Sequence, residues 1–255
     1  MEYIVAADTD IGNTKQVNQD SICVKTADTS KGKVALIMVC DGMGGLSKGE
    51  LASAEVVHSF ADWFDYGLAE ELKNWSWDRI AEITARRLRY LNDTMITYGI
   101  RNDIKLGTTA TGMLVVNSQY MSFHVGDTRI YKIGEELTQI TEDHTYVNLE
   151  MKRGNMTAEE ASKDKRRNAL VQCVGVTGGV SPDIQFGNIE EDVNYFICSD
   201  GMRHVVTDEE ILDILSPRLI TTKSSMIARL RELIELVKLR DEKDNISGAV
   251  FRAEI

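Results

Sequence analysis

Apolar residues along the chain follow two patterns, short runs typical of strands and longer repeats typical of helices. The runs predict strands at residues 3–8, 20–25, 34–41, 109–116, 120–125, 129–133, 195–199 and 246–253. Spacing of three and four residues predicts long amphipathic helices at residues 50–64, 77–98 and 225–240. Residues 141–169 are mostly polar and predict only short helices. Strands therefore lie towards both ends of the chain, with helices between them.

The helical spacing also predicts which side chains face the core. In the helix at 50–64 the apolar positions include Leu51, and in the helix at 225–240 they include Ile227. Residues 169–173 form a further apolar stretch that we expect to be buried. Polar residues at the predicted helix starts, Thr157 and Thr207, each precede a glutamate by three positions, which is the pattern of a capping box.

The order of these elements favours one fold class. Strands and helices do not alternate as βαβ units, so the pattern predicts antiparallel sheets with helices packed outside them, in the α+β class. No low-complexity tract, repeat or Pro/Gly/Ser-rich linker interrupts the chain, and Pro182 and Pro217 are its only prolines. We therefore expect residues 1–255 to form a single domain.

The charge balance narrows the range of partners. The chain has 29 basic and 40 acidic residues, a formal net charge of −11. Such a surface repels nucleic-acid phosphates and anionic lipids, so we expect neither nucleic-acid binding nor membrane insertion. The longest uninterrupted apolar run, residues 34–40, is far shorter than the roughly 20 residues that span a bilayer. An acidic surface does suit divalent cations, provided that its carboxylates converge.

The four cysteines and the first residues of the chain indicate the cellular compartment of the protein. Cys23, Cys40, Cys173 and Cys198 form no CxxC pair and lie in apolar runs, which favours buried free thiols over disulfides. The chain does not open with a basic segment followed by an apolar one, so secretion is not indicated. These features predict a cytoplasmic protein.

Candidate chemistry comes from aspartates at the ends of strands. Asp41, Asp127 and Asp200 each follow an apolar run and have glycine beside them, and Asp244 precedes the last predicted strand. A strand end holds a side chain rigidly, and oxygen ligands of this kind favour Mg²⁺ or Mn²⁺ over Zn²⁺. Asp-Gly is also a common turn dipeptide. On spacing alone, a metal site and a set of ordinary turns are both open interpretations.

Five motifs occur together in register: Asp41-Gly-Met-Gly-Gly45, Gly107-Thr-Thr109, Val125-Gly-Asp-Thr-Arg129, Cys198-Ser-Asp-Gly201 and Asp244-Asn245. In these motifs the chain resembles the metal-dependent protein phosphatases of type 2C (the PPM family), especially their bacterial branch, over about residues 3 to 252. The resemblance implies a four-layer αββα sandwich, in which two antiparallel sheets are flanked by antiparallel helix pairs. It also implies hydrolysis of phosphoserine and phosphothreonine on proteins.

The resemblance further implies a role for each aspartate. Asp41 would bridge two Mn²⁺ or Mg²⁺ ions, the Gly42 carbonyl would help bind one of them, and Asp200 and Asp244 would complete the other. Asp127 would hold a weaker third ion together with Asp200. Asp20 would orient the attacking water, which the two ions would convert to a bridging hydroxide at neutral pH. Residues 145–167 resemble the flap that borders the cleft in bacterial members.

Three positions depart from the family pattern. Lys15 stands where arginine commonly contacts the substrate phosphate, and lysine supplies charge without a bidentate fork. Gln19 stands where glutamate commonly supports a metal. His204 replaces an aspartate of the third-ion site, where it could coordinate as a neutral imidazole or be an exposed residue at a helix start. We expect weakened binding of the third ion.

The expected partners are phosphorylated proteins, among them a serine/threonine kinase and its substrates. We expect the chain itself to be a monomer. Two other functions stay open at this point. One is a catalytically silent relative that binds phosphoproteins, which the substitutions at Lys15, Gln19 and His204 keep in consideration. The other is a metal-dependent hydrolase of small phosphoesters, because the hydroxide mechanism does not depend on what carries the phosphate.

Overall fold

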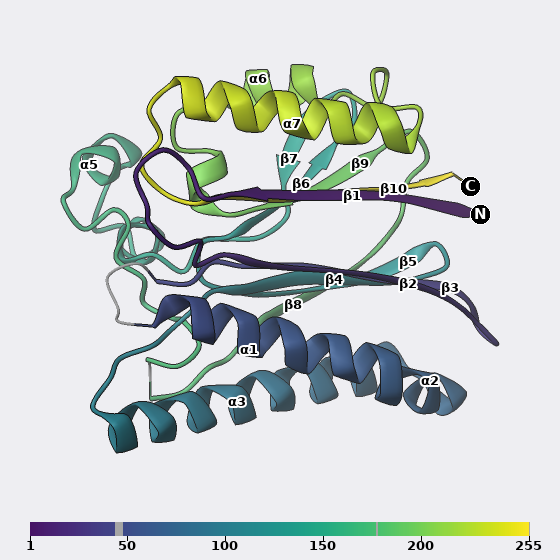
Figure 1. Ribbon diagram of the computed structural model, residues 1–255, viewed down its shortest axis with the longest axis horizontal. Coiled ribbons are helices and arrows are strands. Elements are labelled where there is room, and N and C mark those ends of the chain that lie inside the picture. Colours follow the sequence, from purple (N-terminus) through teal and green to yellow (C-terminus); the bar gives the residue numbers. More distant parts are fainter. Residues whose placement is uncertain (44–47, 177, 255) are drawn as a thin grey trace.

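The computed structural model describes residues 1–43, 48–176 and 178–254, and among them two antiparallel sheets lie face to face (Figure 1). One sheet has the strand order β1-β10-β9-β6-β7, and the other has the order β2-β3-β4-β5-β8. The strands are β1 (Glu2–Asp10), β2 (Ser21–Thr29), β3 (Gly32–Cys40), β4 (Ala110–Val116), β5 (Gln119–Val125), β6 (Arg129–Ile133), β7 (Leu137–Gln139), β8 (Asp183–Asn188), β9 (Asn194–Cys198) and β10 (Ile246–Glu254).

Helices cover the outer face of each sheet. In Figure 1, α1 (Gly49–Asp62) and α3 (Trp77–Asn102) lie against the sheet that contains β3, and α6 (Asp208–Ile214) and α7 (Lys223–Leu239) lie against the sheet that contains β10. The four-layer αββα sandwich is therefore confirmed. The short elements are a π-helical turn (Trp63–Gly67), α2 (Leu68–Glu71), α4 (Tyr146–Lys152), α5 (Ala158–Lys163) and 3-10 turns at Leu72–Asn74 and Asp200–Met202.

Strand β3 illustrates why the sequence builds two buried layers. Its side chains alternate between a core under α1 and α3, which contains Leu36 and Met38, and a core between the sheets, which contains Ile37 and Val39. Successive side chains of a strand point to opposite faces. Because both faces of β3 are covered, residues 34–40 form a continuous apolar run rather than an alternating one. This core fixes the strand whose end carries Asp41.

The predicted helix faces hold at Val57 in α1 and at Leu230, Ile234 and Val237 in α7, which are buried, but fail at one position in each helix. Leu51 is 47 % exposed, whereas Ala52, Val56 and Phe60 are buried. Ile227 is 46 % exposed, whereas the neighbouring Met226 is fully buried. Both helices carry apolar residues on the flanks of the buried stripe, so periodicity alone did not determine which stripe faces the sheet.

Two strands escaped prediction, and one predicted burial was wrong. β7 is only three residues long, and β8 is a largely exposed strand at the edge of its sheet, where polar residues are common. In the segment 169–173 only Cys173 is buried, because these residues run along the surface between α5 and β8. The capping boxes at Thr157 and Thr207 are confirmed, as are four buried free cysteines.

No helix within the described residues combines the length and apolar character that crossing a lipid bilayer requires.

Candidate active site

The strand pairing brings the predicted site residues to one end of the sandwich. Asp20 precedes β2 and Asp41 follows β3, and the pair Ser21–Cys40 ends that ladder. In the other sheet, Asp200 follows β9 and Asp244 precedes β10. These two strands pair antiparallel, so the end of β9 lies near the start of β10. Asp127 lies between β5 and β6, where the chain crosses from one sheet to the other. Residues that are far apart in the sequence therefore converge where several strand ends meet.

A cavity of about 210 Å³ lies at this end of the molecule, and the four predicted metal-binding aspartates line it. Its lining residues are Asp41, Met43, Thr109, Asp127, Asn168, Leu170, Asp200 and Asp244. The other four, Met43, Thr109, Asn168 and Leu170, are not carboxylates and lie outside the named strands and helices. The convergence on which the metal hypothesis depends is thus present in the described residues.

Backbone hydrogen bonds hold Asp41 in place. Its amide donates to Thr109 Oγ1 at 2.8 Å, and its carbonyl accepts from the Thr109 amide at 2.9 Å and from Thr108 Oγ1 at 2.9 Å. The next residue, Gly42, donates its amide to the Gln19 carbonyl at 3.1 Å. A Cβ atom at Gly42 would lie 2.4 Å from the Gln19 carbonyl oxygen, so only glycine fits this crossing. Gly44 and Gly45 of the same motif lie outside the described residues.

The carboxylates are buried close to one another, and this changes their protonation. Burial together with the neighbouring Asp20 and Asp200 raises the pKa of Asp41 well above its usual value. Burial and the charge of Asp200 raise the pKa of Asp127 to about 7, and burial likewise raises the pKa of Asp20 to about 7. Without a cation, these groups cannot all be ionised at neutral pH.

Asp200 is the exception, because it has a cationic neighbour. Burial disfavours its ionised form, but a hydrogen bond from His204 at 3.2 Å outweighs burial, and the pKa of Asp200 falls to about 2. His204 also lies 3.6 Å from Glu242 Oε1. The side chain of His204 is 29 % exposed and belongs to the turn before α6. His204 is thus an exposed residue in the turn before a helix, which is one of the two interpretations of the sequence, and it also contacts two carboxylates, Asp200 four positions earlier and Glu242 farther along the chain.

These residues fit a hard divalent cation. Asp20 Oδ2 is buried and has no hydrogen-bond partner in the described part of the chain, so it is a free oxygen facing the cluster. Among the described residues, no three His, Cys, Asp or Glu side chains form a ready ligand group for one ion. Mg²⁺ needs only a small number of protein ligands, because it keeps several of its waters and uses one or two carboxylates. Mn²⁺ accepts the same oxygen donors.

Lys15 and Gln19 both have partners of their own. Lys15 Nζ lies 2.7 Å from Asp244 Oδ1, so its charge is directed at a candidate metal ligand. The Gln19 side chain donates to Glu50 Oε2 at 3.4 Å. Glutamate at position 19 would place two carboxylates against each other at that point, whereas the neutral amide removes the repulsion. Glu50 escaped sequence reasoning because it lies at the start of an otherwise ordinary helix.

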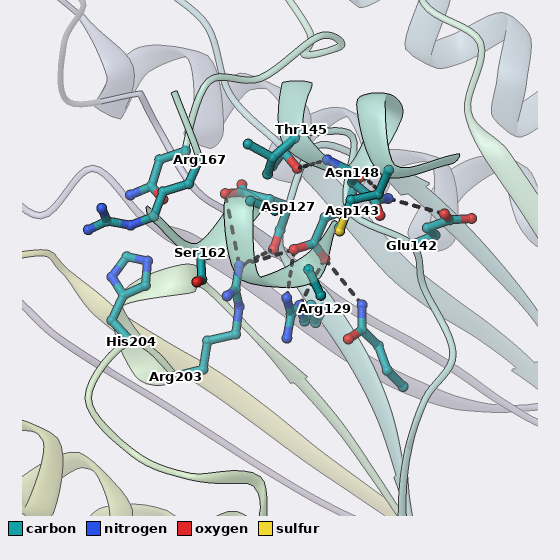
Figure 2. A pocket seen from close by; sticks show the side chains of 16 residues that line it. Asp127, Arg129, Glu142, Asp143, Thr145, Asn148, Ser162, Arg167, Arg203 and His204 are labelled. Carbon is teal, nitrogen blue, oxygen red and sulfur yellow. Dashed lines mark hydrogen bonds and ion pairs between the residues drawn. The ribbon is translucent and has the colours of Figure 1, made fainter. Parts of the chain in front are cut away.

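A second, larger cavity of about 470 Å³ adjoins the site between β6 and the helices α4 and α5 (Figure 2). Asp143 lies in its wall and accepts two hydrogen bonds from Arg129, at 2.8 and 2.7 Å. Arg203 donates to the Asp127 carbonyl at 3.0 Å. Sequence reasoning missed Asp143 and Arg203, although Arg129 belongs to a recognised motif and Arg203 stands beside His204.

His144 has a structural role. Its Nδ1 accepts a hydrogen bond from the Gly126 amide at 3.1 Å, and its Nε2 lies 3.2 Å from Asp183 Oδ2. The histidine therefore fixes the turn that precedes Asp127 and joins it to the start of β8.

Known proteins match this chain along most of its length. The model of the family described as protein phosphatase 2C matches residues 12–235. One relative is a protein of Streptococcus pyogenes serotype M6 that is named as a protein phosphatase of type 2C. It is 31 % identical to this chain over 255 residues, which cover 98 % of this chain and 97 % of the relative.

Solved structures agree with this match. A serine/threonine phosphatase of S. agalactiae superposes with a TM-score of 0.84 at 29 % identity, covering 99 % of this chain and all of that one. The catalytic domain of the serine/threonine protein phosphatase PstP, solved in complex with two manganese ions, superposes with a TM-score of 0.76 at 28 % identity, covering 98 % and 99 %. Fold, motifs and family match agree, and this chain belongs to the protein phosphatase 2C family.

Proposed function

We propose that Asp41, Asp200 and Asp244 hold the two Mn²⁺ or Mg²⁺ ions with which this metal-dependent serine/threonine phosphatase hydrolyses phosphoproteins. The single observation that carries the assignment is one cavity lined by four aspartates. Within this cluster the charge of neighbouring carboxylates raises the pKa of Asp41 further than burial alone. A buried charge cluster of this kind is unfavourable unless cations neutralise it.

The protein groups divide the binding between two positions. Asp41 would serve both ions, with the Gly42 carbonyl beside it on one and Asp200 and Asp244 on the other. When bound, the ions supply Lewis acidity, which activates water near neutral pH and neutralises charge on the phosphate oxygens. The hydrogen bonds from Thr108 and Thr109 to the Asp41 backbone keep its carboxylate from moving as charge develops.

Two further residues would act on water and substrate. Asp20 has a buried, unpartnered carboxylate oxygen and would orient the attacking water. Lys15 would attract the substrate phosphate, and for this its ammonium has to leave Asp244, 2.7 Å away. With an ion held by Asp244, the Lys15 ammonium would lose this partner and be free to meet the phosphate.

The remaining assignments concern the chain as a whole. We place residues 1–255 in a single phosphatase domain, with a flap at 145–167 that contains α4 and α5 and forms part of the wall of the larger cavity. Buried free thiols and an acidic surface support a cytoplasmic monomer that does not bind nucleic acid. Its partners would include a serine/threonine kinase and the substrates of that kinase.

Phosphate release from a phosphothreonine peptide tests the proposal. The wild-type chain should release phosphate with Mn²⁺ and lose this activity with a chelator. Asp41→Ala should be inactive, whereas Asp78→Ala, an exposed position on α3, should match the wild type. Nucleotides and sugar phosphates, assayed in parallel, should be poorer substrates. Equal activity of Asp41→Ala and wild type would remove the assignment of Asp41.

A further inference from the structure

Two cationic side chains lie beside the pair of aspartates that the family uses for a third ion. Arg203 and His204 follow the Ser-Asp-Gly motif after one intervening residue, Met202, in the turn between Asp200 and α6. Arg203 faces Asp127 (Figure 2), and His204 Nε2 lies 3.2 Å from Asp200 Oδ2. Each carboxylate of the pair therefore has a positively charged or hydrogen-bonding group of the protein next to it.

Arg203 is held firmly in this place. Its Nη2 donates to the Asp127 carbonyl at 3.0 Å and lies 3.9 Å from Asp127 Oδ2 and 3.6 Å from Asp143 Oδ2. Only 14 % of its side chain is exposed. Because Asp143 is itself held by two hydrogen bonds from Arg129, the guanidinium of Arg203 is braced from two sides.

The chemistry of these groups differs from that of a metal ligand. A guanidinium keeps its charge at all ordinary pH values and has no lone pair to offer a cation. His204 already uses Nε2 on Asp200, and its Nδ1 faces Glu242 at 3.6 Å. An ion between Asp127 and Asp200 would meet a permanent positive charge on one side and would lack the aspartate that the family pattern implies at position 204. The residues present do not fit a third cation.

We propose that Arg203, assisted by His204, takes the place of the third cation, so that this phosphatase works with two ions and a built-in counter-charge. The inference rests on the proposed two-ion function and deepens it. Arg203 is then a positioning residue, which fixes Asp127 and balances its charge without touching the substrate. Binding of Mn²⁺ should saturate at two ions per chain, with no third ion acquired as the concentration rises to millimolar.

The test is the number of Mn²⁺ ions bound per chain, measured by calorimetric titration and by equilibrium dialysis with elemental analysis. The wild type should bind two. The double variant Arg203→Met/His204→Asp removes the charge at nearly constant length and restores the carboxylate, so it should bind three. The matched control Arg203→Lys/His204→Asp keeps the positive charge and should bind the third ion at least tenfold more weakly than the Met variant. Thermal unfolding of each variant shows whether it is folded.

The possible outcomes test the role of Arg203 separately from the proposed two-ion function. Three ions of similar affinity on the wild type, or equal third-ion affinity in the Met and Lys variants, overturn the role of Arg203 and leave the phosphatase assignment intact. A wild type that binds fewer than two ions and releases no phosphate refutes the two-ion function itself. If a variant does not fold, the wild-type stoichiometry still decides, because two ions support the inference and three overturn it.

Discussion

Asp127 and Asp143 are two buried carboxylates in the wall of the same cavity, and their environments act on them in opposite ways. Burial and the charge of Asp200 raise the pKa of Asp127 to about 7. Burial also opposes ionisation of Asp143, but the two hydrogen bonds from Arg129 outweigh it and hold the pKa of Asp143 below its usual value. The two residues are equally acidic in the sequence, and only their neighbours distinguish them.

The difference separates a carboxylate whose charge is fully paired from one whose charge is only partly balanced. Asp143 is held by two hydrogen bonds from Arg129, so it stabilises the fold in the absence of any ion. Asp127 has Arg203 at 3.9 Å against burial and the charge of Asp200, whereas burial and the neighbouring carboxylates raise the pKa of Asp20 and Asp41, and each charge left uncompensated there raises the free energy of folding. A cluster that lowers stability in the metal-free protein is expected where function demands it.

Asp41→Asn should give the largest effect on activity and the clearest contrast with substitution of Asp143. Loss of the shared carboxylate should reduce kcat about 1,000-fold, because several kcal/mol of transition-state stabilisation depend on the bound ions. The metal-free variant should nevertheless unfold at a higher temperature than metal-free wild type, because one repelling charge is gone. Kinetics with Mn²⁺ and calorimetry with chelator measure the two effects. A lower unfolding temperature for the variant would contradict the picture of a strained cluster.

Asp143→Ala should behave in the opposite way. It leaves Arg129 and Arg203 without their shared carboxylate, and breaking a buried ion pair costs about 3 kcal/mol of stability. Urea unfolding of the metal-free protein measures the loss. Asp183→Ala serves as a control, because that carboxylate is half exposed and its one ion pair within the described residues is with His144. If both variants lose the same small amount, Asp143 is not the structural carboxylate that we describe.

The pH dependence of the metal-free protein should follow the raised pKa values. Asp20 and Asp127 have folded-state pKa values of about 7, against about 3.9 in an unfolded chain, so the folded state binds more protons between pH 4 and 7. Their contribution is present below pH 4 and is lost as the pH rises through 7. The free energy of unfolding should fall by about 2 kcal/mol between pH 5 and 8, since the groups titrate together.

Three measurements check this prediction. Urea unfolding with chelator across the pH range gives the slope, Asp20→Asn should flatten it, and saturating Mn²⁺ should reverse it, because ions favour the ionised carboxylates. Asp143 contributes the opposite sign, since its lowered pKa makes its stabilisation disappear as the pH falls. A metal-free protein that gains stability from pH 5 to 8 would show that compensated groups outweigh the cluster.

Lys15→Arg should give the smallest effect. A guanidinium can bind phosphate with two parallel hydrogen bonds, so KM for a phosphopeptide should fall about threefold with little change in kcat. Lys15→Met is the matched neutral variant, and it should raise KM. An unchanged KM in both variants would show that Lys15 has a structural role, as Asp143 does. Lys15 would then be a partner of Asp244 and not a substrate contact.

Much of the site could be predicted because its residues occupy strand ends in short motifs. Asp41, Asp127, Asp200 and Asp244 were identified from position and resemblance, and their convergence follows from antiparallel pairing of the strands that carry them. The partners of these residues could not be predicted. Asp143 and Glu50 act through contacts with residues far away in the chain, and neither lies in a pattern that sets it apart.

The helix faces show the same limit. Leu51 and Ile227 satisfy the periodicity as well as Ala52 and Met226 do, and the choice between them depends on how each helix lies on its sheet. The edge strand β8 is polar because one of its sides has no neighbouring strand, so its sequence carries only a weak strand signal.

The sequence by itself determined the layers of this protein, its strand ends and the identity of its acidic residues, because periodicity and motif order are local properties. Only the tertiary structure decided which carboxylates would be charged. Protonation depends on burial and on charges within a few ångströms, and apart from His204 beside Asp200 these charges come from residues distant in the sequence. Arg129 and Arg203 reach Asp143 through the fold, and Lys15 reaches Asp244 from the opposite end of the chain.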